Sequence, residues 1–329
     1  MVTPYIPDGL ASRTADAIQA RLMDELIDRF QMNAYVLWYS MPMAIAATRH
    51  LSPLVVIYDC MDELAAFAGA PAQLSAREAA LLEWADVVFT GGWSLYEARR
   101  ARHPRVYPFP SSVDVAHFAR ARQLLPEPDD QRDIPAPRLG FFGVIDERMD
   151  LNLVAAVADA RPDWQHVFLG PVMKIDPAQR PHRPNIYWLG PKPYASLPEY
   201  IAGWQVAWLP FVRNEATRYL SPTKTPEYLA SGTPVVSTSI RDVVRAWGDS
   251  GLVTIADSVA DVVAAMEAAR VQDLVKWLVC VDSALTGMSW ECTWQEMARH
   301  IDAAIERHRV LTTDVNLVDG RWDMAATSD

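Results

Sequence analysis

The chain has 329 residues, of which 50% are apolar and 22% charged, and its formal net charge is −11 at pH 7. This length is generous for one core and suits two domains, and the composition is that of an ordinary globular protein. The acidic balance excludes a general nucleic-acid binder, because such a protein needs a basic surface to displace counterions from phosphates. Three cysteines are too few for a disulfide framework or a zinc site, so we expect a reduced, cytoplasmic protein.

Targeting signals and membrane spans are not recognisable in the sequence. The N-terminus has neither the basic segment nor the apolar core of a signal peptide. The longest apolar runs have the length of a strand, far below the roughly 20 residues that cross a bilayer. We therefore expect a chain that does not span a membrane, which leaves peripheral contact with the inner membrane open.

Short apolar runs alternate with longer helical patterns along the first part of the chain. Apolar residues at helical spacing predict helices over 13–29 and 75–84. The continuously apolar runs are typical of strands buried on both faces of a parallel sheet, and they lie at 35–39, 54–58 and 87–89. The Pro- and Asp-rich segment 125–137 indicates an interdomain linker.

A second α/β series follows the linker. Its predicted strands lie at 139–143, 166–170, 185–190, 206–210, 234–237 and 252–255. A long helix is expected over 290–308, and residues 310–329 have the composition of a poorly ordered tail. Strands that alternate with helices in this way predict two doubly wound parallel sheets, whose ligands bind outside the carboxyl ends of the strands.

The segment 221–236 carries the strongest chemical signal. Ser221 and Pro222 suit the N-cap and first position of a helix, and Gly232 suits its end. Pro226 either lies late in the first turn, with the loss of one hydrogen bond, or restarts the helix. In both cases Lys224 and Glu227 are three residues apart and emerge on one face.

This face combines a cation with a helix N-terminus. Free N–H groups and the helix dipole favour an anion there, and the Lys224 ammonium makes the site suitable for a diphosphate. Glu227, nearly one turn further along, can accept hydrogen bonds from ribose hydroxyls. On spacing alone, an ordinary surface ion pair is the favoured explanation of the two residues.

The motif resembles the nucleotide-binding core of the retaining glycosyltransferases of family 4, glycosyl transferases of group 1. A bacterial subgroup carries a Pro-x-Lys-x-x-Glu-Tyr-x-Ala-x-Gly pattern, met here by Pro222, Lys224, Glu227, Tyr228, Ala230 and Gly232. The resemblance extends to 109–118, 141–148, 170–172, 185–194 and 214–218. It implies the GT-B fold, in which two Rossmann-like domains face a cleft.

The resemblance also implies domain boundaries and site residues. We expect an N-terminal acceptor-side domain with its linker at 1–135, a nucleotide-sugar domain at 136–289, a helix crossing back at 290–309 and a tail at 310–329. Lys224 would stabilise the departing diphosphate, and Asp59 and Asp62 would orient the acceptor hydroxyl, although helix capping is an equal alternative for both aspartates. The expected donor-binding residues are Gly143, Arg148, Gly170, Pro171, Tyr194, Arg218, Thr223, Lys224 and Glu227.

The expected activity is transfer of a sugar, with retention, from a nucleoside diphosphate sugar to a hydroxyl group. The donor is expected to be a UDP-sugar, and the acceptor a glycan or lipid-linked carrier in envelope or exported polysaccharide synthesis. No cofactor or metal is expected, because the sequence contains no Asp-x-Asp pair. The alternatives are a non-catalytic glycan-binding subunit and a nucleotide-sugar epimerase, and a homodimer remains open.

Two departures from the family pattern stand out. Tyr219 occupies the position at which many relatives carry a first glutamate, eight residues before Glu227. The N-terminal domain is also short by about one βαβ unit, so a strand at 2–6 is expected near an exposed sheet edge.

Trp38 and Trp93 lie near strand ends, where core packing is favoured over a sugar-stacking platform. His117 is expected to pack between the domains.

Overall fold

A computed structural model describes residue 3, residues 5–67 and residues 69–322 of the chain, with side chains to residue 310. The chain forms two compact units. The first comprises Met1–Gly91, Leu95–Phe109 and Trp294–Asp329, and the second comprises Gly92–Ser94 and Pro110–Thr293. The segment from Pro110 to the expected boundary at 135 thus belongs to the second unit.

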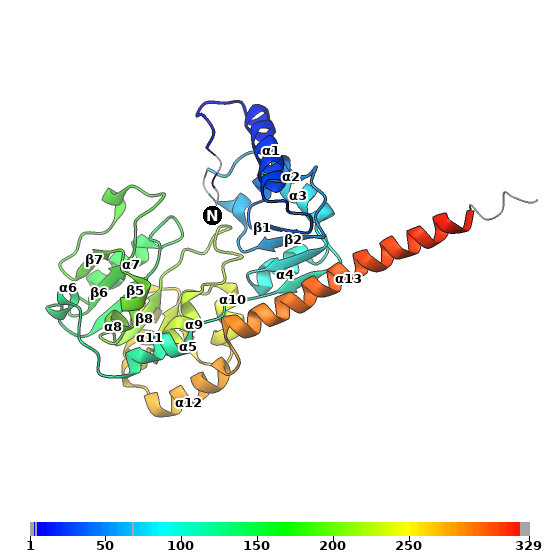
Figure 1. Ribbon diagram of the computed structural model, residues 1–329. Coiled ribbons are helices and arrows are strands. Elements are labelled where there is room, and N and C mark those ends of the chain that lie inside the picture. The colour runs from blue at the N-terminus through cyan, green and yellow to red at the C-terminus, as the bar shows by residue number, and fades with distance from the viewer. Residues whose placement is uncertain (1–2, 4, 68, 323–329) are drawn as a thin grey trace, which may run out of the picture. The chain divides into compact units, whose positions relative to one another are not determined.

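The first unit contains a parallel four-stranded sheet with the order β1-β2-β3-β4, of which Figure 1 labels β1 and β2. Its strands are β1 (Val36–Tyr39), β2 (Val55–Cys60), β3 (Val87–Thr90) and β4 (Val106–Pro108). Since right-handed crossovers that all advance in one direction place their connections on one face, the intervening helices share a face of this sheet. These helices are α2 (Ile45–Thr48), α3 (Leu74–Trp84) and α4 (Trp93–Arg99), with 3₁₀ turns at Pro42–Ala44 and Leu64–Ala66.

Helix α13 (Trp290–Trp322) covers the opposite face. Ile301 and Ala304 pack there against Ile57 and Phe89 of the sheet. The helix does not end near 308 as expected, because its helical backbone continues to Trp322. Residues 323–329 lie outside the described part of the chain.

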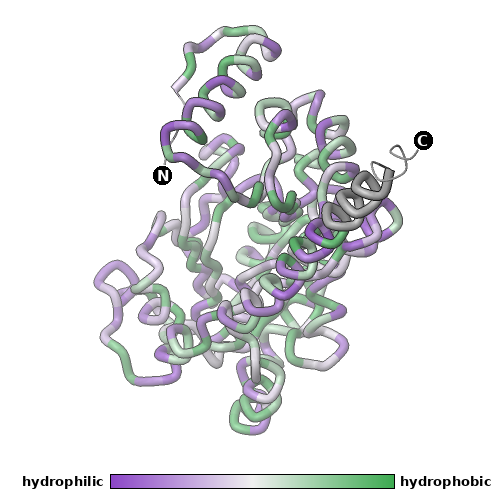
Figure 2. Tube along the Cα trace, turned by 45° about the vertical axis from the view of Figure 1, so that its right-hand side comes forward, coloured by the Kyte–Doolittle hydropathy of each residue, from purple (hydrophilic) through white to green (hydrophobic). Residues whose placement is uncertain are grey.

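Helix α1 (Ser12–Arg29) precedes the sheet and has no buried residue. It mixes hydrophilic and hydrophobic turns (Figure 2), and an ion pair of 2.6 Å between Asp16 and Arg77 joins it to α3. The strand expected at 2–6 is not found: Thr3, Tyr5 and Ile6 are not in a strand, and residues 2 and 4 lie outside the described residues. Among the described strands, β1 instead forms the edge of the sheet.

The second unit contains a parallel six-stranded sheet with the order β10-β9-β8-β5-β6-β7. Counted from β5, this is the 3-2-1-4-5-6 order of a doubly wound sheet, with its switch point between β5 and β8. The strands are β5 (Arg138–Phe142), β6 (Gln165–Leu169), β7 (Ile186–Gly190), β8 (Val206–Leu209), β9 (Val235–Ser237) and β10 (Val253–Ile255). Two parallel sheets in an α/β chain confirm the predicted fold class.

Short and medium helices connect these strands. They are α5 (Val115–Ala119), α6 (Asp129–Arg132), α7 (Leu151–Ala160), α8 (Leu197–Ile201), α9 (Lys224–Ser231), α10 (Arg241–Val243), α11 (Val259–Val271) and α12 (Leu274–Leu285). Shorter turns lie at Arg120–Arg122, Pro177–Gln179 and Tyr194–Ser196, and a π-helical turn lies at Val244–Gly248. Within the described residues, no helix combines the length and apolar character needed to cross a membrane.

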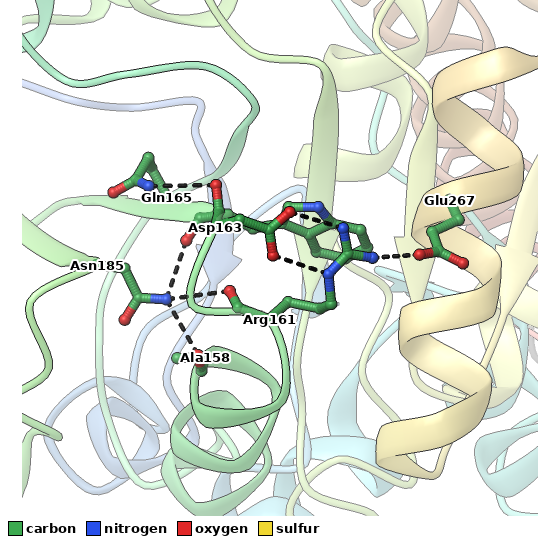
Figure 3. A network of polar contacts seen from close by, with 7 residues as sticks. Ala158, Arg161, Asp163, Gln165, Asn185 and Glu267 are labelled. Carbon is green, nitrogen blue, oxygen red and sulfur yellow. Dashed lines mark hydrogen bonds and ion pairs between the residues drawn. The ribbon is translucent and has the colours of Figure 1, made fainter.

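A polar network ties the amino ends of β6 and β7 to the neighbouring helices (Figure 3). The Asn185 amide donates to the carbonyl oxygens of Ala158 at 3.0 Å, Arg161 at 3.2 Å and Trp164 at 2.9 Å. The Arg161 guanidinium pairs with Asp163 and with Glu267 of α11. These bonds satisfy the carbonyl groups where α7 ends. The network lies at the amino ends of the strands, and the loops of the candidate site lie at the opposite, carboxyl ends.

Candidate donor-binding site

Two glycines allow the loops after β5 and β6 to touch, next to the switch point between β5 and β8. Gly143 and Gly170 have φ angles of 137° and 142°, which side-chain-bearing residues rarely adopt. The Gly143 N–H donates to the Leu169 carbonyl at 2.8 Å, and the Gly170 N–H donates to the Gly190 carbonyl at 2.8 Å. A Cβ on Gly170 would lie 1.8 Å from the Gly143 carbonyl oxygen. Glycine is therefore required at this close approach of two backbones.

Helix α9 begins at Lys224, beside the same loops, and its N-cap is Thr223. The expected N-cap at Ser221 is therefore wrong by two residues, and no side chain caps this helix. Pro226 is the third helical residue, where an N–H would have no intrahelical partner, so proline loses no hydrogen bond there. The helix ends on Gly232, whose φ of 79° gives the expected left-handed cap.

The Lys224 side chain occupies the space that the missing Cβ of Gly143 leaves. An ideal Cβ on Gly143 would lie 1.9 Å from Lys224 Cε and 2.8 Å from Nζ. The ammonium group is thus held at the carboxyl end of β5, next to the first turn of α9. This geometry brings together the cation and the helix N-terminus that the sequence motif suggested.

Glu227 lies at the end of the first turn of α9, with most of its side chain removed from water. Burial raises the pKa of its carboxyl to about 7, and the nearby Lys224 ammonium opposes this shift. Burial also raises the pKa of the Tyr194 phenol, and the charges of Glu227 and Asp114 raise it further. Glu227, Lys224 and Tyr194 therefore share one electrostatic environment, in which a carboxyl group titrates near neutral pH.

Tyr194 is 51% exposed and lies against His117. The two rings stack with centroids 4.4 Å apart, and a His117 ring nitrogen lies 3.1 Å from the Tyr194 carbonyl oxygen. Both residues belong to the second unit, so His117 packs within that unit rather than between domains. Asp114 caps the short helix α5 through the His117 N–H at 2.9 Å, which places a second carboxylate near the Tyr194 ring.

Tyr228 is a positioning residue that motif reasoning did not single out. It is fully buried, and its hydroxyl accepts a hydrogen bond of 2.9 Å from the Phe142 N–H, at the last residue of β5. This bond fixes α9 against β5, so the spacing of Lys224 from Gly143 depends on it. The tyrosine that directly follows Glu227 in the motif was the available signal for this role.

The remaining predicted donor-binding residues contact other groups of the second unit. Arg148 forms a bidentate pair with Asp146, with nitrogen–oxygen distances from 2.7 to 3.1 Å. Arg218 is mostly exposed and lies 3.4 Å from Glu215. Pro171 follows Gly170, and its carbonyl accepts the Ile145 N–H at 2.9 Å. Arg148 and Arg218 thus already have carboxylate partners within the chain, and their contact with a donor remains a prediction.

Asp59 and Asp62 lie in the first unit, at and after the end of β2. Trp38 Nε1 donates to Asp59 Oδ2 at 3.2 Å, and the Cys60 thiol lies 3.7 Å from the Asp62 carbonyl oxygen. Neither aspartate is the N-cap of a helix or 3₁₀ turn. Among the described residues, no group of three or more His, Cys, Asp or Glu side chains is arranged to hold a metal ion.

Comparison with known proteins supports the family resemblance of the second unit. Residues 136–270 match the model of the family "Glycosyl transferases group 1". The chain is 27% identical over 224 residues to a Bacillus subtilis protein named as a teichuronic acid biosynthesis glycosyltransferase, TuaH. This alignment covers 62% of the chain and 55% of TuaH, so the chain spans about half the length of this relative.

Solved structures share the fold at low sequence identity. Sucrose-phosphate synthase of Thermosynechococcus elongatus superposes with a TM-score of 0.66 at 16% identity, over 91% of this chain and 81% of that one. HepE of Anabaena, in complex with UDP and glucose, superposes with a TM-score of 0.64 at 12% identity, over 86% of this chain and 81% of the HepE chain. Residues 136–270 are therefore similar to the group 1 glycosyl transferases, and the chain has the GT-B fold.

Proposed function

We propose that this protein transfers a sugar from a nucleoside diphosphate sugar to a hydroxyl group of an acceptor. The observation that carries this proposal is the meeting of Lys224 and Glu227 with Gly143 at the switch point of the six-stranded sheet. Doubly wound sheets bind their ligands at this place. A cation and a helix N-terminus suit the diphosphate, and the adjacent carboxyl suits the ribose.

In the proposed reaction, the acceptor oxygen forms a bond to the anomeric carbon of the sugar while the bond from that carbon to the diphosphate breaks. The diphosphate leaves with the electron pair, and the acceptor hydroxyl loses its proton. Lys224 and the first turn of α9 stabilise the charge that develops on the leaving group, as preorganised donors do in a water-poor site. Asp59 and Asp62 keep their predicted role of orienting the acceptor hydroxyl.

The finer features of the proposal come from the family resemblance. We infer retention at the anomeric carbon and independence of metal ions from the motif at 222–232. In this motif the Lys224 ammonium supplies the positive charge that a metal ion would otherwise provide to the diphosphate. A uridine nucleotide is proposed because HepE, which shares the fold, was solved with UDP. The name of TuaH supports an acceptor in envelope polysaccharide synthesis, with the protein in the cytoplasm and in peripheral contact with the inner membrane.

A thermal-shift panel of UDP-, GDP-, ADP- and dTDP-sugars tests the donor site. A ligand at about 100 times its Kd adds about 2.7 kcal/mol to the free energy of unfolding, so one base should raise the Tm clearly. The Glu227→Gln variant should lose this shift, whereas Glu199→Gln, which alters a half-buried pair with Arg120, should keep it. The absence of a shift with all four nucleotide sugars would contradict the proposal.

A further inference from the structure

One face of the first sheet gathers aromatic and acidic side chains at the carboxyl end of its strands. Trp38 lies opposite Ile57 in the β1–β2 register, and Asp59 lies opposite Phe89 in the β2–β3 register. Because alternate residues of a strand share a face, all four project from the face that α13 covers. Trp294 lies on α13 two turns before Ile301, which is buried on this sheet.

Two tryptophans of this face keep much of their rings accessible. Trp38 is 40% exposed and Trp294 is 52% exposed. Their ring centroids lie 6.3 Å apart, at an interplanar angle of 32°, and the ring centroid of Phe89 lies 5.7 Å from that of Trp38. Scattered exposed apolar residues need no explanation, whereas two adjacent, partly exposed tryptophans form a candidate binding surface.

The Asp59 carboxylate beside this surface lacks part of its hydrogen bonding. Oδ2 accepts the indole N–H of Trp38, whereas Oδ1 is buried and has no hydrogen-bond partner among the described residues. Burial raises the pKa of this carboxyl, and the hydrogen bond from Trp38 opposes the shift. An acceptor oxygen that is buried without a donor destabilises the site until a ligand supplies one.

We propose that Trp38, Trp294 and Asp59 form a subsite for a non-acidic pyranose ring of the acceptor glycan. A pyranose offers an apolar C–H face to the two indole rings and hydroxyl donors to the Asp59 carboxylate. This pairing of broad apolar contact with one or two placed polar groups is the usual construction of a small-molecule site. The proposal rests on the proposed glycosyltransferase function and assigns its acceptor a chemical class.

The same groups disfavour other occupants. A uronic acid would bring a second carboxylate close to Asp59, where like charges repel in a medium of reduced dielectric constant. A lipid chain would cover the tryptophans but leave Asp59 Oδ1 without a donor. An alkylammonium ion would satisfy both the rings and the carboxylate, so the experiment must separate it from a neutral sugar.

Binding of the full chain to an array of neutral hexoses, N-acetylhexosamines and uronic acids, without nucleotide, tests this subsite. The wild type should bind neutral or N-acetylated glycans, and tetramethylammonium should not compete. Trp294→Ala should weaken binding about tenfold or more, as removal of a central aromatic anchor does. Trp290→Ala is the matched control, because Trp290 lies one turn earlier on α13 and is 54% exposed. Asp59→Asn should reduce the discrimination against uronic acids.

The nucleotide thermal shift of the same variants serves as the check on folding and should stay at the wild-type value. The subsite would be overturned if Trp294→Ala and Trp290→Ala had equal effects on glycan binding, or if neither had an effect. It would also be overturned if tetramethylammonium competed, or if the wild type bound no glycan on the array. Glycan binding that depends on Trp294 in a protein that binds no nucleotide sugar would support the subsite and contradict the proposed transferase function. The two failures are thus distinguishable.

Discussion

At the scale of single residues, Glu227 is the side chain whose environment departs most clearly from that of a surface carboxylate. Its pKa of about 7 comes from burial, opposed by Lys224. If the ribose hydroxyls donate to this carboxylate, Glu227→Ala should weaken nucleotide binding by about 1.5–3 kcal/mol, the usual contribution of a hydrogen bond to a charged group. Isothermal titration calorimetry measures this directly, and an unchanged nucleotide Kd would rule out the ribose role.

Nucleotide binding should also release protons near pH 7. Hydrogen bonds to the ionised form favour that form, so a bound ribose lowers the pKa of Glu227 below 7. Affinity should therefore rise as pH increases through 7 and level off above it. Calorimetry at pH 7 in two buffers of different ionisation enthalpy counts the released protons. The Glu227→Gln variant should release none, and equal release by this variant would assign the protons to another group.

His166, on β6, predicts a loss of stability in acid. Both its ring nitrogens are buried without a hydrogen-bond partner among the described residues, and burial lowers its pKa to about 4. Between pH 6.5 and 4 the unfolded state takes up a proton that the folded state does not. Stability is therefore complete above pH 6.5 and falls as pH decreases, by about 3 kcal/mol at about 1.36 kcal/mol per pKa unit.

The His166→Leu variant should lose this part of the pH dependence. The free energy of unfolding in urea, measured from pH 7 to 4, should fall less in the variant than in the wild type by about that 3 kcal/mol. His182→Leu, at an exposed histidine, should follow the wild type. Parallel curves for His166→Leu and the wild type would show that His166 does not titrate as its burial implies.

At the scale of elements, the position of α9 against β5 depends on the Tyr228 hydroxyl. Tyr228→Phe keeps the buried ring but leaves the Phe142 N–H without its acceptor. The free energy of unfolding should fall by about 1–3 kcal/mol, as expected for an unsatisfied buried donor, and nucleotide affinity should fall with it as Lys224 shifts. Urea unfolding measures the loss. The same change at Tyr5, which is 95% exposed, should leave stability unaltered.

At the scale of the whole molecule, the two sheets differ in completeness. The second sheet has the full doubly wound order with its switch point, whereas the described part of the first unit contains four strands in sequential order. The donor site is built within the second unit, and the proposed sugar subsite is built within the first. Nucleotide binding and glycan binding should therefore respond to separate sets of substitutions.

Turnover of the donor should survive chelation. The sequence has no Asp-x-Asp pair, and Lys224 with the N-terminus of α9 supplies the positive charge that the leaving diphosphate requires. The initial rate of nucleotide release should stay unchanged after dialysis against EDTA. A rate that falls to background and returns with Mn²⁺ would overturn this mechanism, whereas Lys224→Ala should lower the rate in every buffer.

The strands were the most predictable part of the fold. Continuous apolar runs such as 54–58 and 206–210 mark buried parallel strands, because both faces of such strands are covered. β4 (Val106–Pro108) was missed because it is three residues long and contains a proline, which only an edge strand tolerates. The extension of α13 beyond His308 was also missed, since its last part lacks the regular apolar spacing used to recognise helices.

The sequence by itself determined the α/β alternation, the Lys224–Glu227 motif and the resemblance of residues 136–270 to the group 1 glycosyl transferases, because these depend on the order and spacing of residues along the chain. The tertiary structure decided the rest of the site. The approach of Lys224 to Gly143, the bond from Phe142 to Tyr228 and the platform of Trp38, Asp59 and Trp294 join residues far apart in sequence. The pKa of Glu227 likewise depends on how completely other elements exclude water from it, and local sequence does not encode that burial.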